Sequence, residues 1–118
     1  MEFIQSKDNK TIKHIVSLGQ RKNRSKYGEY IVEGIRSIRD ISTMGVIKAI
    51  VIRESKCKDK NIEALLSLES MQSIPTYIAQ DPVFDKIDKT VNGQSIVAIV
   101  SKPKHSMESI SIEDGVYI

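Results

Sequence analysis

The sequence predicts an α/β fold, a three-layer α/β/α sandwich around a four-stranded sheet that is mostly parallel or mixed. Segments with apolar residues at helical spacing alternate along the chain with short segments rich in β-branched residues. Ile96–Val100 is apolar at every position, which is typical of a strand covered on both faces. A length of 118 residues, 40% of them hydrophobic, is enough for one domain with its own core.

The predicted helices begin at residues that can cap free N–H groups and end near glycines or polar stretches. The first runs from Asp8 or Asn9 to Gln20, and the second follows Gly34 to about Met44, where Gly45 stops it. A third spans about Asn61–Gln72, and a short fourth opens at Asp81, the expected N-cap, followed by Pro82. The residues expected to face the core are Ile12, Ile15, Val16, Leu18, Ile35, Ile38, Ile41, Ile62, Leu65, Leu66, Leu68 or Met71, Val83, Phe84 and Ile87.

Four strands are expected between these helices, at Glu29–Glu33, Val46–Ile52, Thr76–Ala79 and Ile96–Val100. Residues 102–114 form a polar, serine-rich segment with the composition of a linker. Val116–Ile118 has the composition of the first residues of another strand. We therefore expect a domain over residues 1–101, a linker over 102–114, and the start of a truncated second domain at 115–118.

Several functional classes find no support in the composition. Cys57 is the single cysteine, which excludes an internal disulfide framework and fits a reducing cytoplasm. Neither histidine, His14 on the expected surface of the first helix nor His105, has the spacing of a zinc ligand. Asp81, Asp85 and Asp88 alternate with lysines and indicate a solvated face. There is no apolar run long enough to cross a membrane and no signal peptide, so we expect a cytoplasmic protein with no membrane partner.

Charge is distributed unevenly along the chain. Residues 1–60 hold 14 Lys and Arg against 7 Asp and Glu, a net charge of +7, whereas residues 61–118 hold 4 against 8, a net of −4. The positive charge peaks in an expected exposed loop from Arg21 to Gly28. Arg21, Lys22, Arg24 and Lys26 suit phosphate contacts, and Tyr27 could stack on an unpaired base. The alternative interpretation is a solvated helix end whose cations complement the helix dipole.

Two further segments are candidates for the same interface. Where the first strand meets the second helix, the N–H groups of Gly34 and Ile35 could meet an anion, with Arg36 adding charge. Alternatively, Glu33 caps the helix and Gly34 only makes the turn. Gln94, just before the last strand, could bind a base edge or a ribose hydroxyl, or could simply be solvated.

Taken in order, these segments resemble the start of SpoU-family RNA methyltransferases. The resemblance lies in Asn9–Leu18 (NKTIKHIVSL), Arg21–Lys26 (RKNRSK), Gly28–Arg36 (GEYIVEGIR) and the segment around Gln94, although Ser95 stands where that family usually has glycine. It covers roughly residues 5–101. It implies a small α/β/α sandwich, similar to ribosomal proteins that bind kinked RNA, that holds structured ribosomal or transfer RNA.

The resemblance also implies a second, knotted domain that binds S-adenosylmethionine, transfers its methyl group to a ribose 2′-hydroxyl and forms a homodimer. The Asn-x-Gly-x-x-x-Arg segment that marks that domain does not occur in this sequence. We therefore expect no catalytic, cofactor-binding or metal-binding residue in these 118 residues, and an inactive, monomeric fragment. The RNA-binding candidates are Arg21, Lys22, Arg24, Lys26, Tyr27, Glu33, Gly34, Arg36 and Gln94.

Three other functions stay open from the residues alone. The first is a stand-alone RNA-binding protein of the kinked-RNA type with no enzymatic activity. The second is a small enzyme, for which no acid–base pair, metal set or phosphate loop is present. The third is a protein-interaction module, whose negative C-terminal half would bind a basic partner.

Overall fold

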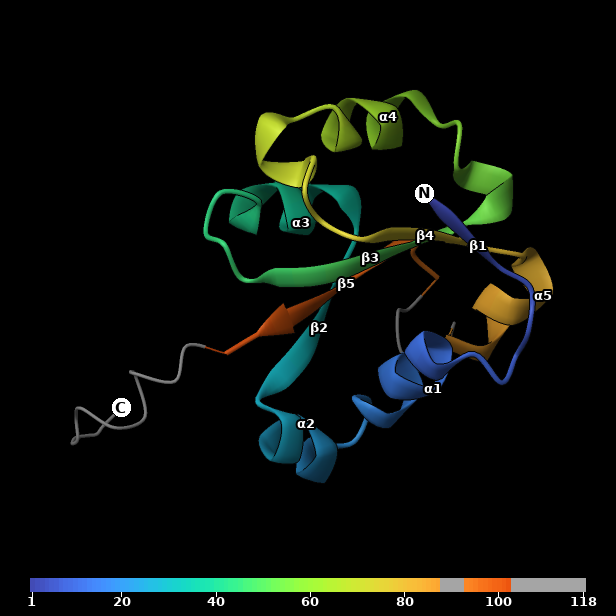
Figure 1. Cartoon of the computed structure of the whole chain (residues 1–118), viewed down its shortest axis with the longest axis vertical. Helices are drawn as coiled ribbons and strands as arrows, with labels where there is room; N and C mark the ends of the chain where they lie inside the picture. The colour runs from blue at the N-terminus through green and yellow to red at the C-terminus, as the bar shows by residue number, and fades with distance from the viewer. Residues whose placement is uncertain (88–92, 103–118) are drawn as a thin grey trace.

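A computed structural model describes residues 1–87 and 93–102, which form a mixed sheet between two layers of helices (Figure 1). The linker and second-domain start expected beyond residue 102, together with Asp88 and Asn92, lie outside the described residues. The strands are β1 (Glu2–Ile4), β2 (Glu29–Glu33), β3 (Ile47–Arg53), β4 (Thr76–Ala79) and β5 (Ile96–Ser101). The helices are α1 (Lys10–Ser17), α2 (Arg21–Tyr27), α3 (Ile35–Ile41), α4 (Lys60–Leu66) and α5 (Asp81–Phe84), with 3₁₀ turns η1 (Glu54–Lys56), η2 (Glu69–Met71) and η3 (Asp85–Ile87).

The sheet has five strands, in the order β1-β4-β3-β5-β2, and not the four expected. Strands β1, β4 and β3 run parallel, whereas β5 pairs antiparallel with both β3 and β2, so the prediction of a mixed sheet is confirmed. The unexpected strand is β1. Its three residues are too few to show a period of two, and its place in the sheet comes from pairing with β4 and from Ile4, which is 2% exposed.

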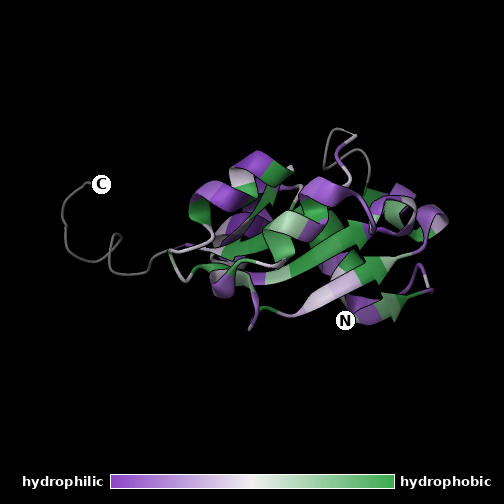
Figure 2. Ribbon diagram, turned by 90° about the horizontal axis from the view of Figure 1, so that it is seen from above, coloured by the Kyte–Doolittle hydropathy of each residue, from purple (hydrophilic) through white to green (hydrophobic). Residues whose placement is uncertain are grey.

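Each face of the sheet carries its own core, as the apolar runs predict. Along β5, Val97 and Ile99 pack with α1, α5 and η3, whereas Ile96, Ala98 and Val100 pack with α3, α4 and η2. This alternation follows from the two-residue period of a strand. Figure 2 shows hydrophobic strands in the middle of the molecule and hydrophilic residues on the outer helices.

The N-terminal helical region differs from the prediction. The Asn9 side chain caps α1 by accepting from the N–H groups of Thr11 and Ile12, but α1 ends at Ser17 and not at Gln20. Val16, expected to face the core, is 44% exposed. The segment from Arg21 to Tyr27, expected to be a loop, is helix α2, which Gly28 ends in the left-handed conformation at φ 65°.

The other helices are shorter than predicted. Helix α3 ends at Ile41, before Met44, and α4 ends at Leu66, followed by a separate turn η2. That turn buries Met71 and leaves Leu68 exposed, which decides between the two alternatives. The N-cap of α5 is Gln80, not Asp81.

Asp81 instead joins a contact between β3 and α5. Its carboxylate accepts the N–H of Ser55 at 3.0 Å, and this hydrogen bond lowers the pKa of Asp81 below the usual range. Arg53 donates to the carboxylate of Asp85 at 2.9 Å, and its guanidinium lies 4.7 Å from the centre of the Phe84 ring. The solvated acidic face expected here therefore contributes ion pairs that hold α5 beside the sheet.

Candidate functional site

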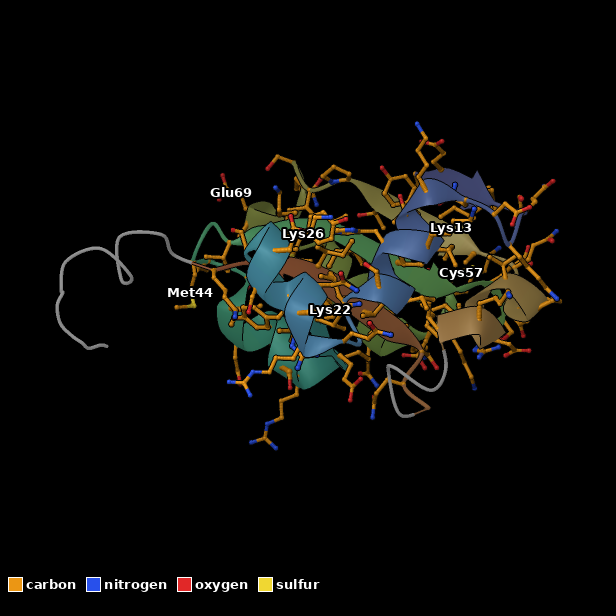
Figure 3. The ribbon with its side chains drawn as sticks, turned by 90° about the horizontal axis from the view of Figure 1, so that it is seen from below. Lys13, Lys22, Lys26, Met44, Cys57 and Glu69 are labelled. Atoms are coloured by element: carbon orange, nitrogen blue, oxygen red, sulfur yellow. The ribbon has the colours of Figure 1, made fainter. Side chains whose placement is uncertain are left out.

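The four clustered cations stand on one short helix, α2, which contains no acidic residue. Since residues three or four apart share a helix face, Arg21 and Arg24 form one row and Lys22 and Lys26 another. Arg24 is half-buried, and the other three are exposed. Viewed from below, α1 and α2 lie on the near side of the molecule, with Lys22 and Lys26 among their side chains (Figure 3).

Polar contacts with the end of α1 hold this basic helix in place. The side-chain amide of Asn23 donates to the carbonyl of Ser17 at 2.9 Å, and Arg24 Nη1 donates to the carbonyl of Leu18 at 3.0 Å. Helix α2 buries no residue of its own. Its position therefore depends on these contacts and on the Gly28 turn, and not on an apolar face.

Tyr27 ends α2 and is 47% exposed. Its ring meets the His14 ring edge-on, with centroids 4.8 Å apart, and Lys26 Nζ lies 5.3 Å from its centroid. One side of the ring is thus engaged within the protein. The predicted stacking of Tyr27 on a base stays a prediction.

A buried carboxylate lies next to this tyrosine contact. Glu29 is 9% exposed, its Oε1 is hydrogen-bonded to His14 Nε2, and its Oε2 lies 3.1 Å from Lys48 Nζ. Burial raises the pKa of Glu29, but the hydrogen bonds from His14 and Lys48 lower it more, so the carboxyl pKa lies below its usual value. The sequence interpretation of His14 as a surface residue is wrong, since it is half-buried and joins α1 to β2.

The second group of candidates gathers where β2 ends. Gly34 adopts φ 89°, and its N–H donates to the carbonyl of Ile96 at 3.0 Å. That hydrogen bond contradicts the expectation that this N–H meets an anion. The N-cap of α3 is Gly34 and not Glu33, and the predicted turn at Gly34 is confirmed.

Gln94 lies directly over Gly34. A Cβ placed on Gly34 would stand 3.1 Å from Gln94 Oε1, which is closer than side chains normally tolerate. The structure thus brings Gln94 together with the Gly34 turn, as the grouping of candidates suggested. Beside them is a cavity of about 340 Å³, lined by residues that include Ile35, Lys56 and Ser95.

The two groups of candidates lie at opposite ends of β2 and do not form one compact site. Helix α2 leads into the start of β2, whereas Gly34 follows its end. The five residues of β2 lie between Gly28 and Gly34, a span of roughly 20 Å at the usual rise per residue. The candidate residues are therefore spread over an elongated surface, with one group at each end of β2.

Between the two groups runs a groove that the sequence did not indicate. It follows the outer edge of β2, which is the last strand of the sheet, and has a volume of about 880 Å³. One rim comes from α1 and α2, and the other from α3. Its lining residues are Leu18, Gly19, Arg24, Tyr30, Ile31, Val32, Glu33, Ser37, Asp40 and Ile41.

Across residues 1–87 and 93–102, no three or more His, Cys, Asp or Glu side chains are grouped as metal ligands would be. In the same part of the chain, no helix has the length and apolar character needed to cross a membrane.

A family model described as "MRM3-like substrate binding domain" matches residues 9–98. No curated protein matches the chain. Among solved structures, an rRNA methyltransferase from Sinorhizobium meliloti superposes with a TM-score of 0.66 at 21% identity over 86% of this chain. An RNA 2′-O ribose methyltransferase gives 0.65 at 17% over 97%, and the SpoU methyltransferase AviRb from Streptomyces viridochromogenes, in complex with AdoMet, gives 0.64 at 18% over 90%.

Because the sequence identities are 21% or lower, the similarity to these solved structures establishes the fold alone. This chain spans 37%, 41% and 38% of their respective lengths. The α/β sandwich expected from the sequence is thus the fold of a part of each of these proteins.

Proposed function

Because the chain belongs to the family of MRM3-like substrate-binding domains, we propose that it holds structured RNA for a ribose 2′-O-methyltransferase. That membership confirms the resemblance to SpoU methyltransferases read from the sequence. In this proposal residues 1–101 form the RNA-docking domain, residues 102–114 link it to a catalytic domain, and residues 115–118 begin that domain.

The observation that carries the proposal is the charge of α2. Four cations without an intervening acid stand on a helix that Asn23 and Arg24 hold against α1. Arginine and lysine at this density suit a phosphate backbone, which supplies most of the affinity in non-specific RNA contacts. Arg21, Lys22 and Lys26 reach solvent and contact phosphates, whereas Arg24 also supports the helix.

A second contact lies at the other end of β2. Arg36 is exposed on the first turn of α3, and Gln94 is exposed over Gly34. In the proposal these two side chains touch the same RNA that α2 holds, while Glu33 and Gly34 shape the surface between them. A spacing of roughly 20 Å along β2 requires an RNA segment longer than a single nucleotide.

The chemical step belongs to the whole protein. S-adenosylmethionine gives its methyl group to a ribose 2′-oxygen, which loses its proton, and S-adenosylhomocysteine is released. The segment that marks the cofactor domain does not occur in these 118 residues, so the role of this chain is to bind and orient RNA. The whole protein is a cytoplasmic homodimer through its catalytic domain, and this chain alone is inactive and monomeric.

The test is RNA binding across a salt series with a structured ribosomal RNA fragment. Wild type is compared with an Arg21→Ala/Lys22→Ala/Lys26→Ala variant, which spares Arg24 because Arg24 hydrogen-bonds Leu18. The logarithm of the binding constant should fall less steeply with the logarithm of salt, by roughly two to three in slope, as three phosphate contacts are lost.

The matched control removes three exposed lysines elsewhere, in a Lys58→Ala/Lys60→Ala/Lys86→Ala variant. It should keep the wild-type slope. Equal slopes for all three proteins would remove α2 from the interface. If the control variant weakens binding as much as the α2 variant does, RNA binding depends on the net charge of the protein and not on the cations of α2.

A further inference from the structure

We infer that the groove along the outer edge of β2 captures one unpaired nucleotide of the bound RNA, with guanine as its preferred base. This inference rests on the proposed function and deepens it, because it assigns base recognition to a surface distinct from the phosphate contacts of α2.

The floor of the groove is mostly apolar. Tyr30 and Val32 are half-buried on one side of β2, Ile31 is half-buried on the other, and Leu18 closes the end near α1. An unpaired base that has left the RNA stack can instead stack on aromatic and apolar side chains of a protein. A volume of about 880 Å³ falls in the range of pockets that hold small ligands, so a base and its ribose can enter.

The backbone of β2 offers a fixed hydrogen-bonding pair in the middle of this floor. Gly34 and Gly28 hydrogen-bond their partners Ile96 and Lys102, and bonded pairs alternate along an antiparallel ladder. The N–H and C=O of Ile31 therefore face outward, into the groove. One donor and one acceptor at Ile31 suit hydrogen bonding to the edge of an unpaired base.

The two rims differ in charge. Arg24 stands on the α2 rim, where its contact with Leu18 fixes it, and Asp40 stands on the α3 rim. This asymmetry orients an inserted nucleotide, with phosphate towards α2 and the base edge towards Asp40. The Asp40 carboxylate accepts hydrogen bonds and repels acceptors. Guanine presents two adjacent donors, N1–H and N2–H, that match two carboxylate oxygens, whereas uracil presents one donor between two acceptors.

The experiment uses the 118-residue protein and three fluorescein-labelled RNA hairpins that differ at one position. One carries a single bulged guanosine, one a bulged uridine, and one is fully paired. Fluorescence anisotropy should show the guanosine bulge bound roughly tenfold more tightly than either of the others, the size expected of one bidentate base contact. Asp40→Asn should remove most of the preference for guanosine over uridine.

A second variant blocks the groove without touching the core. Ser37 is exposed and lines the groove, so Ser37→Trp should abolish the advantage of the bulge while leaving the salt dependence of binding intact. The control is Ala64→Trp, which places the same side chain on an exposed position of α4 outside the groove. This variant should still bind the guanosine bulge more tightly than the paired hairpin.

The outcomes separate the two proposals. No binding of any hairpin would overturn RNA docking itself. Equal binding of all three hairpins, unchanged by Ser37→Trp, would overturn the groove assignment and leave docking through α2 intact. A concentration-dependent dimer in sedimentation that Ser37→Trp abolishes would assign the groove to a second copy of the chain and would also overturn the inference.

Discussion

His14 on α1 and Glu29 on β2 are joined by a hydrogen bond between Nε2 and Oε1, although 15 residues separate them in the chain. Helix α2 lies between them in sequence, and Tyr27 at its end packs against the His14 ring. Lys48 from β3 completes the cluster on the other carboxylate oxygen. The end of the basic helix thus packs on a histidine that the Glu29 carboxylate hydrogen-bonds, in addition to the contacts that Asn23 and Arg24 make with the end of α1.

Glu29→Gln should destabilise the protein by roughly 1–3 kcal/mol at pH 7, because a buried hydrogen-bonded charge is lost. The pKa of Glu29 is lowered by folding, so its stabilising effect is complete above the pKa of an unfolded glutamate, about 4.3. That effect is lost as the pH falls through the lower folded-state pKa. Urea unfolding of wild type and Glu29→Gln from pH 7 to pH 3 measures this effect. The difference between their free energies of unfolding should shrink as the pH falls, and a difference that stays constant would contradict the ion pairs.

Gly34→Ala should destabilise the fold by roughly 1–3 kcal/mol, because Gly34 holds φ 89° and Gln94 Oε1 lies 3.1 Å from the added Cβ. Adding Gln94→Ala removes the contact but not the backbone strain, so the double variant should recover only part of the loss. A double-mutant cycle in urea measures the coupling. Full recovery would show that the contact, and not the backbone, requires glycine.

Asn9→Ala should cost about 1 kcal/mol, since the Asn9 side chain accepts from two N–H groups at the start of α1. Asn9→Asp keeps the acceptor and adds a favourable charge at the helix N-terminus, so it should restore stability. Asp59 caps α4 in the same way and gives a matched comparison. Thermal unfolding that is insensitive to Asn9→Ala would mean that α1 needs no cap.

Strand β1 can be tested through its one buried side chain. Ile4→Ala should cost roughly 2–5 kcal/mol, the usual loss for a large buried residue, whereas Phe3→Ala, at a position 57% exposed, should cost little. Similar small losses at both positions would mean that β1 contributes little to the sheet. Urea unfolding of the two variants measures the difference.

The sequence predicted those parts of the fold whose signals are local. Glu29–Glu33 and Thr76–Ala79 are strands with the expected bounds, because β-branched and aromatic residues there lie between turn residues. The apolar run at Ile96–Val100 correctly indicated a sheet covered on both sides. A cap at Asp8 or Asn9 followed from residue type, and the structure shows that Asn9 is the one that caps α1.

The sequence did not predict features that depend on distant partners. Helix α2 has no apolar stripe, and its contacts with Ser17 and Leu18 cannot be read from a helical period. Asp81 has the residue type of an N-cap, but Ser55 takes its carboxylate. The division of the candidate residues between the two ends of β2, and the groove between them, could not be predicted without the order of the strands.

The groove along the outer edge of β2 recesses this strand between α2 and α3, which affects the solubility of the protein. An edge strand with open backbone groups normally invites pairing with another molecule and, through repetition, aggregation. Here a second strand would have to enter past a helix on either side, one of which carries four positive charges that repel their counterparts on another copy. This recess therefore protects the edge of the sheet against self-association.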